Sequence, residues 1–225
     1  MIVFLEDFEL VSPSLGQSRR VTVFRAVDER PSSALPVLYC ADGQALHAFA
    51  STLTAATHAG STPPVTLIGP HSYEATRAQE YVTGIDEQRF LAHERFFTNE
   101  LCSWAESQFG IRSPRESCGI FGFSNGSALA ISMAARHPHR YGAVIAFSVP
   151  GDPNRVVQPP IDPDSAPRYY LSAGTREAGF RRTTKAISQI LLRQGIECQH
   201  TERAARHDLR FWCAELPQAI AWSFS

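Results

Sequence analysis

The sequence predicts an α/β fold, with a mostly parallel sheet, antiparallel strands at its N-terminal edge and helices on both faces. Short apolar runs alternate with helical segments along most of the chain, as in a parallel sheet covered on both sides. Of the 225 residues, 44% are hydrophobic and 19% charged, which is enough apolar material for a buried core. We find no internal repeat and no long linker, so we expect a single domain over residues 1–225.

Eight strands are expected from short apolar or alternating runs. Residues 7–11 and 19–26 are predicted to form an antiparallel pair, joined by a turn around Ser14, Leu15 and Gly16. The other six runs are residues 35–40, 65–68, 118–123, 144–149, 168–173 and 197–202. The first of these six ends at Asp42-Gly43, a pair typical of turns.

Five helices are expected between the strands, at residues 45–58, 90–109, 126–136, 182–193 and 209–224. The second is predicted to be continuous, because Phe90, Phe97 and Leu101 recur near helical spacing and Gly110 follows its end. Two segments are interpreted as loops. Residues 69–88 are mostly polar, and residues 150–167 contain six prolines.

Composition argues against several classes of protein. The formal net charge of −1 gives no basic excess for binding a nucleic-acid backbone. No apolar run approaches the roughly 18 residues of a membrane span, and the acidic N-terminal segment does not resemble a secretory signal. The five cysteines form no CxxC pair, which argues against a disulfide framework or a zinc site. We therefore expect a cytoplasmic protein without a metal.

The pentapeptide Gly122-Phe123-Ser124-Asn125-Gly126 matches Gly-x-Ser-x-Gly. The motif is weak by itself, but here it follows an apolar strand and begins a helix of small residues, as a nucleophile elbow does. Ser124 is therefore the candidate nucleophile, and the N–H of Asn125 is a candidate oxyanion donor at the start of the helix. The simpler interpretation is a glycine-rich turn in which Ser124 caps the helix.

A serine nucleophile needs a base, and His207 is the best placed of the eight histidines. It lies between the last predicted strand and the last helix, at the edge of a parallel sheet where functional loops gather. The neighbouring Asp208 is expected to cap that helix.

The acid is expected after a strand between the elbow and the histidine. Glu177 follows residues 168–173 and is preferred; Asp152 is the main alternative, with Asp162 and Asp164 also possible. The second oxyanion donor is expected from the loop after residues 35–40, where the N–H of Gly43 or Gln44 could supply it. An ordinary turn explains this loop equally well.

With these pieces in place, the chain resembles the esterase family that includes enterochelin esterases, esterase D and the mycolyltransferases. The matching stretches are residues 36–43, the elbow 122–126, residues 174–177 and His207-Asp208 with Trp212. The resemblance implies the α/β-hydrolase fold, and ester hydrolysis by Ser124, Glu177 and His207. It further implies that Arg77, Glu80 and Tyr81, in a family-like Arg-Ala-Gln-Glu-Tyr stretch, lie near bound substrate. In one departure, Arg206 stands where the family usually has glycine.

The function expected from these features is hydrolysis of a small-molecule carboxylic ester through an acyl-serine, without a cofactor. An acyltransferase with the same three residues and a non-catalytic binding protein are the alternatives. A nucleotide-binding domain is disfavoured, because no glycine-rich loop follows the first strand. The sequence identifies neither the particular ester nor the oligomeric state.

Overall fold

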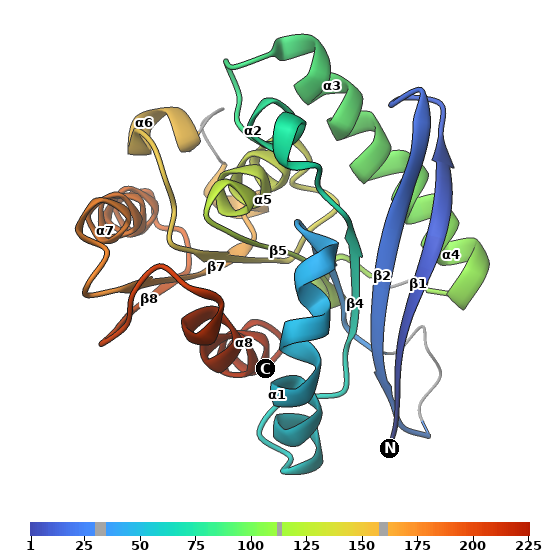
Figure 1. Ribbon diagram of the computed structural model, residues 1–225. Coiled ribbons are helices and arrows are strands. Elements are labelled where there is room, and N and C mark those ends of the chain that lie inside the picture. The colour runs from blue at the N-terminus through green and yellow to red at the C-terminus, as the bar shows by residue number, and fades with distance from the viewer. Residues whose placement is uncertain (30–34, 112–113, 158–161) are drawn as a thin grey trace.

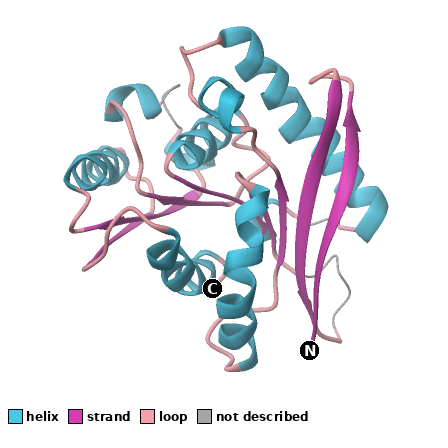
Figure 2. Cartoon of the chain, in the orientation of Figure 1, coloured by secondary structure: helices cyan, strands magenta, loops and turns pink. Residues whose placement is uncertain are grey.

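The computed structural model describes residues 1–29, 35–111, 114–157 and 162–225. Within these residues, eight strands form one sheet in the order β1-β2-β4-β3-β5-β6-β7-β8. Figures 1 and 2 show this twisted sheet with helices on both of its faces. The predicted α/β architecture is therefore confirmed.

The N-terminal edge of the sheet is antiparallel. Strand β1 (Ile2–Ser12) pairs with β2 (Gln17–Val27) along its whole length, and β2 also pairs antiparallel with β4 (Thr66–Pro70). The hairpin is longer at both ends than the predicted strands, because the register continues from Ile2 opposite Val27 to Ser12 opposite Gln17. Gly16 occupies the left-handed region in the connecting turn, which suits glycine.

The remaining strands run parallel to β4. They are β3 (Val37–Cys40), β5 (Cys118–Phe123), β6 (Ala143–Phe147), β7 (Arg168–Gly174) and β8 (Cys198–Arg203). Every residue of β3, β4, β5 and β6 is buried. This burial explains why their sequences are apolar runs without alternation.

Two helical layers cover the sheet. Helices α1 (Leu46–His58) and α8 (Leu209–Ser223) pack on one face, and they lie side by side in Figure 1. The other face is covered by α2 (Glu74–Tyr81), α3 (Glu87–Arg95), α4 (Leu101–Phe109), α5 (Asn125–Arg136) and α7 (Ala178–Arg193). Side chains alternate between the two resulting cores along the strands: Ile120 and Val144 face one, Phe121 and Ile145 the other.

The predicted long helix is interrupted. It begins at Glu87, where the side chain of Asp86 accepts the N–H of Arg89, and it changes to a π-helix, η3 (Phe96–Glu100), before α4. Phe96 and Phe97, on this widened turn, are fully buried. The spacing of apolar residues does not distinguish a π-helical turn from an α-helical one, so this change could not be predicted from the sequence.

The two predicted loops also contain helices. Residues 69–88, interpreted as a polar loop, include α2 and the start of α3. In the proline-rich segment, α6 (Pro153–Val156) and a short 3-10 helix, η5 (Pro163–Ser165), each begin at a proline after an aspartate cap. Residues 158–161 of that segment lie outside the described residues. Helix α2 was missed because its mean hydropathy is low and its buried face consists of polar or aromatic side chains.

The chain order creates a topological switch point between β3 and β5. From β3 the chain continues to β4 on one side, whereas β5 is followed by β6, β7 and β8 on the other. The loops after β3 and β5 therefore leave the sheet in opposite directions, next to each other at the carboxyl ends of the parallel strands. Open α/β sheets bind ligands at this position. Among the described residues, no helix is long and apolar enough to cross a membrane.

Candidate active site

The serine of the pentapeptide lies on a tight turn between β5 and α5. Ser124 has φ 53° and ψ −132°, in the positive-φ range that non-glycine residues rarely adopt. The flanking glycines allow this turn: a Cβ on Gly122 would lie 1.9 Å from the carbonyl oxygen of Gly126. Ser124 is thus presented at the N-terminus of a buried twelve-residue helix, the geometry of a nucleophile elbow.

His207 reaches Ser124 from the loop between β8 and α8. Its Nε2 lies 3.2 Å from Ser124 Oγ, although 83 residues separate the two in the chain. The imidazole is stacked on the ring of Phe180, with 3.9 Å between ring centroids, and it lies perpendicular to the ring of Trp212. These two aromatic contacts hold the orientation of the histidine, whose side chain is 30% exposed.

The carboxylate of Glu177 lies on the far side of His207. Its Oε2 is 2.6 Å from His207 Nδ1, and its Oε1 accepts hydrogen bonds from the N–H of Gly174 (2.5 Å) and the hydroxyl of Ser148 (2.7 Å). Trp212 Nε1 in turn donates to Ser148 Oγ at 2.9 Å. The Glu177 carboxylate is almost fully buried, and these hydrogen bonds hold both of its oxygens in place.

The alternative acids Asp152, Asp162 and Asp164, all in the described part of the chain, do not contact His207, and Asp164 is exposed on η5. Asp152 is exposed and caps α6 by accepting the N–H of Asn154, and Asp162 caps η5 by accepting the N–H of Asp164. Asp208 caps α8 through the N–H of Phe211, as expected. Among the described carboxylates, Glu177 is therefore the one that the structure places against the imidazole of His207.

The loop after β3 passes close to the elbow. Asp42 is in the left-handed conformation (φ 57°) and precedes η2 (Gly43–Ala45), a short 3-10 helix. A Cβ on Gly43 would lie 1.7 Å from the carbonyl oxygen of Gly69, so only glycine fits against β4 here. A Cβ on Gly126 would lie 2.8 Å from Ala41 Cβ and 3.0 Å from an Asp42 carboxylate oxygen, so this loop and the elbow are in direct contact.

The resemblance placed Arg77, Glu80 and Tyr81 near substrate, and the structure places all three on α2. The guanidinium of Arg77 makes two hydrogen bonds of 2.7 Å to the Asp42 carboxylate, and the Tyr81 hydroxyl accepts the N–H of Asp42 at 3.1 Å. Glu80 forms a buried ion pair with Arg19 on β2. Glu80 and Tyr81 are 3% and 1% exposed, and both bond to protein groups. The contacts of Arg77 and Tyr81 position the Asp42 loop.

Sequence reasoning did not identify Ser148, Asp42 or Phe180 as parts of the site. Ser148 follows β6 in a left-handed conformation (φ 54°) and is fully buried, and its hydroxyl connects Trp212 to Glu177. The sequence predicts an ordinary turn at Asp42-Gly43, which gives no reason to place Asp42 in the site. No pattern in the sequence reveals a serine whose partners lie 29 and 64 residues further along the chain.

A cavity of about 440 Å3 lies next to Asn125, the residue after Ser124. It is lined by α5, by residues 82–85 before α3 and by the start of the proline-rich segment, including Ile85, Ala128 and Val156. Its size and partly apolar lining suit part of a small organic ligand.

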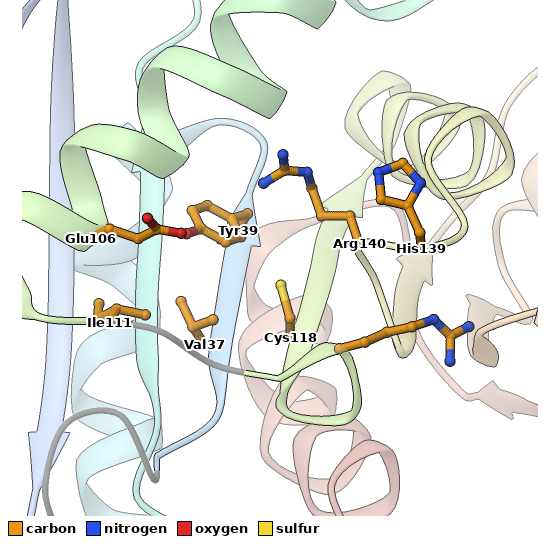
Figure 3. A pocket seen from close by; sticks show the side chains of 8 residues that line it. Val37, Tyr39, Glu106, Ile111, Cys118, His139 and Arg140 are labelled. Atoms are coloured by element: carbon orange, nitrogen blue, oxygen red, sulfur yellow. The ribbon is translucent and has the colours of Figure 1, made fainter.

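A second hollow lies at the opposite end of the sheet and is smaller, about 220 Å3. Figure 3 shows its lining, with Val37 and Tyr39 on β3 beside Cys118 at the start of β5 and Arg140. The candidate nucleophile follows the other end of β5, so this hollow is not part of the site. Among the described residues, no group of three or more His, Cys, Asp or Glu side chains could hold a metal ion.

The sheet order, the elbow at its switch point and the loops at the carboxyl ends of the strands define an α/β-hydrolase. The family model described as "Putative esterase" matches residues 12–223. The chain therefore belongs to this esterase family and is a carboxylic ester hydrolase.

Solved structures support the fold. A ferulic acid esterase is 18% identical, with 99% of this chain and 98% of that chain covered and a TM-score of 0.76. The enterochelin esterase from Shigella flexneri is 20% identical, with 98% of this chain covered and a TM-score of 0.81. The chain spans only 58% of that longer protein. The S-formylglutathione hydrolase from Staphylococcus aureus is 14% identical, with both chains covered completely and a TM-score of 0.76. No curated protein matches the sequence.

Proposed function

We propose that Ser124, His207 and Glu177 form a catalytic triad that hydrolyses a small-molecule carboxylic ester through an acyl-serine. The observation that carries this proposal is the continuous chain of contacts from Ser124 Oγ to His207 Nε2, at 3.2 Å, and from His207 Nδ1 to Glu177 Oε2, at 2.6 Å. A nucleophile within reach of a base that is oriented by a third group is the arrangement that activates a serine.

In the first half-reaction, Ser124 Oγ attacks the ester carbonyl carbon while its proton passes to His207 Nε2. Glu177 accepts a hydrogen bond from Nδ1–H, which keeps that proton on Nδ1 and leaves Nε2 free to act as the base. The carbonyl electron pair becomes an oxyanion in the tetrahedral intermediate. When this intermediate collapses, the bond to the leaving oxygen breaks, His207 returns the proton to that oxygen, and the acyl group remains on Ser124.

In the second half-reaction, His207 removes a proton from water, and the resulting hydroxide attacks the acyl carbon. The Ser124 Oγ–acyl bond breaks, and Oγ takes the proton back from His207. One ester and one water give one acid and one alcohol, so no further reactant is needed.

The proposed oxyanion hole lies at the contact between the elbow and the Asp42 loop. The N–H of Asn125, in the first turn of α5, is one donor, and the N–H of Gly43 or Gln44, at the start of η2, is the other. Arg77 and Tyr81 hold Asp42, and Arg77 Nη2 also lies 3.4 Å from the carbonyl oxygen of Phe123, directly before the nucleophile. In this proposal α2 positions the two halves of the hole, and Glu80 anchors α2 through Arg19.

The test is the variant Ser124→Ala, assayed with 4-nitrophenyl acetate. Loss of the nucleophile is expected to lower kcat by at least about 10⁴-fold while the circular dichroism spectrum is unchanged. A fluorophosphonate probe should label the wild type and leave this variant unlabelled. Ser188→Ala is the matched control, because Ser188 is buried on α7 and its hydroxyl donates to the carbonyl oxygen of Lys185. Full activity or labelling in Ser124→Ala would refute the proposal.

A further inference from the structure

Two exposed arginine side chains, those of Arg176 and Arg206, lie beside His207. Arg176 and Arg206 line a hollow of about 580 Å3 together with His207 and the stacked ring of Phe180. The same two arginines border a neighbouring hollow of about 760 Å3, which Arg203 and Arg210 also line. Arg176, Arg206 and Arg210 are exposed. The net charge of the chain is only −1, so this concentration of positive charge is local.

The backbone fixes the two loops that carry Arg176 and Arg206 next to each other. The N–H of Thr175 donates to the carbonyl oxygen of Arg203 at 2.7 Å, and the N–H of Arg176 donates to that of Ala205 at 3.0 Å. A Cβ on Gly174 would lie 2.5 Å from the Ala205 carbonyl oxygen, so this close approach depends on glycine. Glu177 and His207 extend from the same two loops, and the positions of the arginines are therefore tied to those of the catalytic groups.

The carboxylates near these arginines already have other partners. Glu215 accepts hydrogen bonds from Arg203 Nε and from the hydroxyls of Tyr170 and Thr201. Asp208 caps α8, and Glu177 binds His207. Among the described residues, no carboxylate lies within ion-pair distance of Arg176 or Arg206. Their guanidinium groups are free to bind an anion from solution, which they can hold through two parallel hydrogen bonds.

The proposed mechanism indicates which part of the substrate lies in the hollow that Arg176 and Arg206 line. His207 gives its proton to the leaving oxygen, so the leaving alcohol lies against the imidazole, and the hollow lined by Arg176, Phe180 and Arg206 continues from it. The cavity beside Asn125 is left for the acyl group.

We propose that Arg176 and Arg206 bind a carboxylate or phosphate group on the leaving-alcohol side of the substrate, so that the enzyme prefers esters of anionic alcohols. This proposal rests on the proposed function and adds a substrate class to it. The two arginines contact a remote part of the substrate and take no part in proton transfer. Their contribution belongs to substrate binding, so their loss should raise KM more than it lowers kcat.

The experiment compares three acetate esters of substituted phenols: 4-acetoxybenzoate, 4-acetoxyphenyl phosphate and the neutral methyl 4-acetoxybenzoate. For each enzyme variant, kcat/KM for each anionic ester is divided by that for the neutral ester, which cancels general losses of activity. The variants are Arg176→Gln with Arg206→Gln, and the single variant Arg193→Gln. Arg193 is an exposed arginine at the other end of α7, about 24 Å of helix away from the site.

The double variant is expected to lower the ratio for at least one anionic ester about tenfold, mainly through KM, while Arg193→Gln leaves both ratios unchanged. The anionic ester whose kcat/KM ratio falls more in the double variant shows whether a carboxylate or a phosphate is the preferred group. Raising the salt concentration should lower the wild-type ratio and have less effect on the double variant. Unchanged ratios in the double variant, or an equal loss in Arg193→Gln, would overturn this inference. Neutral-ester hydrolysis that survives Ser124→Ala would instead overturn the proposed function.

Discussion

Backbone strain in this protein is concentrated at the candidate site. Among the described residues, the non-glycine residues with positive φ are Asp42, Ser124 and Ser148. Each follows a strand, β3, β5 or β6, and these three strands are neighbours in the sheet. Such conformations cost roughly 1–3 kcal/mol each, and they persist only where the surroundings impose them. Here they place three side chains at one edge of the sheet: the candidate nucleophile, the serine that bonds Glu177, and the aspartate beside the elbow.

A buried histidine outside the candidate site, His93, makes the stability of the protein depend on pH. His93 on α3 is 1% exposed, it packs against the rings of Tyr81, Phe96 and Phe97, and neither ring nitrogen has a hydrogen-bond partner. Burial lowers the pKa of His93 from 6.5 to about 4. Between these two pH values the unfolded chain takes up a proton that the folded chain does not. This residue therefore costs stability as the pH falls below 6.5, by at most about 1.4 kcal/mol per pH unit, and the loss levels off near pH 4.

We expect His93→Leu to raise the free energy of unfolding, and to raise it more at pH 5 than at pH 7.5. The substitution removes two unpaired buried nitrogens and keeps an apolar side chain of similar size. Urea unfolding at the two pH values measures the effect. His58→Gln, at the exposed end of α1, is the control and should change the free energy of unfolding little. An equal change at both pH values would mean that His93 does not titrate in this way.

At the scale of elements, α2 connects the Asp42 loop to the elbow. Arg77 and Tyr81 are one helical turn apart, so both face Asp42, and Arg77 also approaches the carbonyl oxygen of Phe123 at the end of β5. The Asp42 carboxylate is 3% exposed and the Arg77 side chain 21%. A short polar helix thus supports two loops that come from different strands.

Arg77→Gln is expected to lower kcat for 4-nitrophenyl acetate by about 10- to 100-fold, because small displacements of catalytic groups are costly. It should also lower the free energy of unfolding by about 2 kcal/mol, since the Asp42 carboxylate loses two charge-assisted hydrogen bonds. Steady-state kinetics and urea unfolding measure the two effects. The control is Arg89→Gln, which removes an exposed ion pair to Asp86 and should change each quantity little. If kcat stays at the wild-type value, α2 does not position the oxyanion hole.

At the scale of the whole molecule, one buried ion pair joins the antiparallel edge of the sheet to the site. Arg19 on β2 makes two hydrogen bonds of 3.0 Å to Glu80 on α2, and the two side chains are 0% and 3% exposed. Burial raises the pKa of Glu80, but the bonds from Arg19 more than offset this, and the pKa of the carboxyl lies below 4.5. Since α2 holds the Asp42 loop, the edge hairpin supports the site indirectly.

Glu80→Gln is expected to lower the free energy of unfolding by about 3–5 kcal/mol, because it leaves the Arg19 cation buried without a counter-charge. The double variant Arg19→Met with Glu80→Leu should recover most of that loss, since it buries no charge. Urea unfolding at pH 7 compares the three proteins. A loss below about 1 kcal/mol in Glu80→Gln would indicate that water reaches Arg19 and that the pair does not support the fold.

Much of the fold follows from local patterns in the sequence. The six parallel strands lie within a few residues of their predicted positions, because buried apolar runs and their flanking turns are local signals. The helices at residues 74–81 and 153–156 were not predicted. The first has a low mean hydropathy, and the second is only four residues long. For the site, the residue types and their order along the chain were enough to propose Ser124, His207 and Glu177, and the structure brings these three side chains within hydrogen-bond distance.

The sequence by itself determined the alternation of strands and helices, the glycines that permit the elbow, and the candidate residues on the loops. Only the tertiary structure decided which of Glu177, Asp152, Asp162 and Asp164 contacts the imidazole. It also decided that Ser148 and Trp212 support that carboxylate, and that Arg77 bonds Asp42. The physical reason is distance along the chain. Helix and strand signals arise between near neighbours in sequence, whereas these contacts join residues 29 to 64 positions apart and depend on how the whole sheet is ordered.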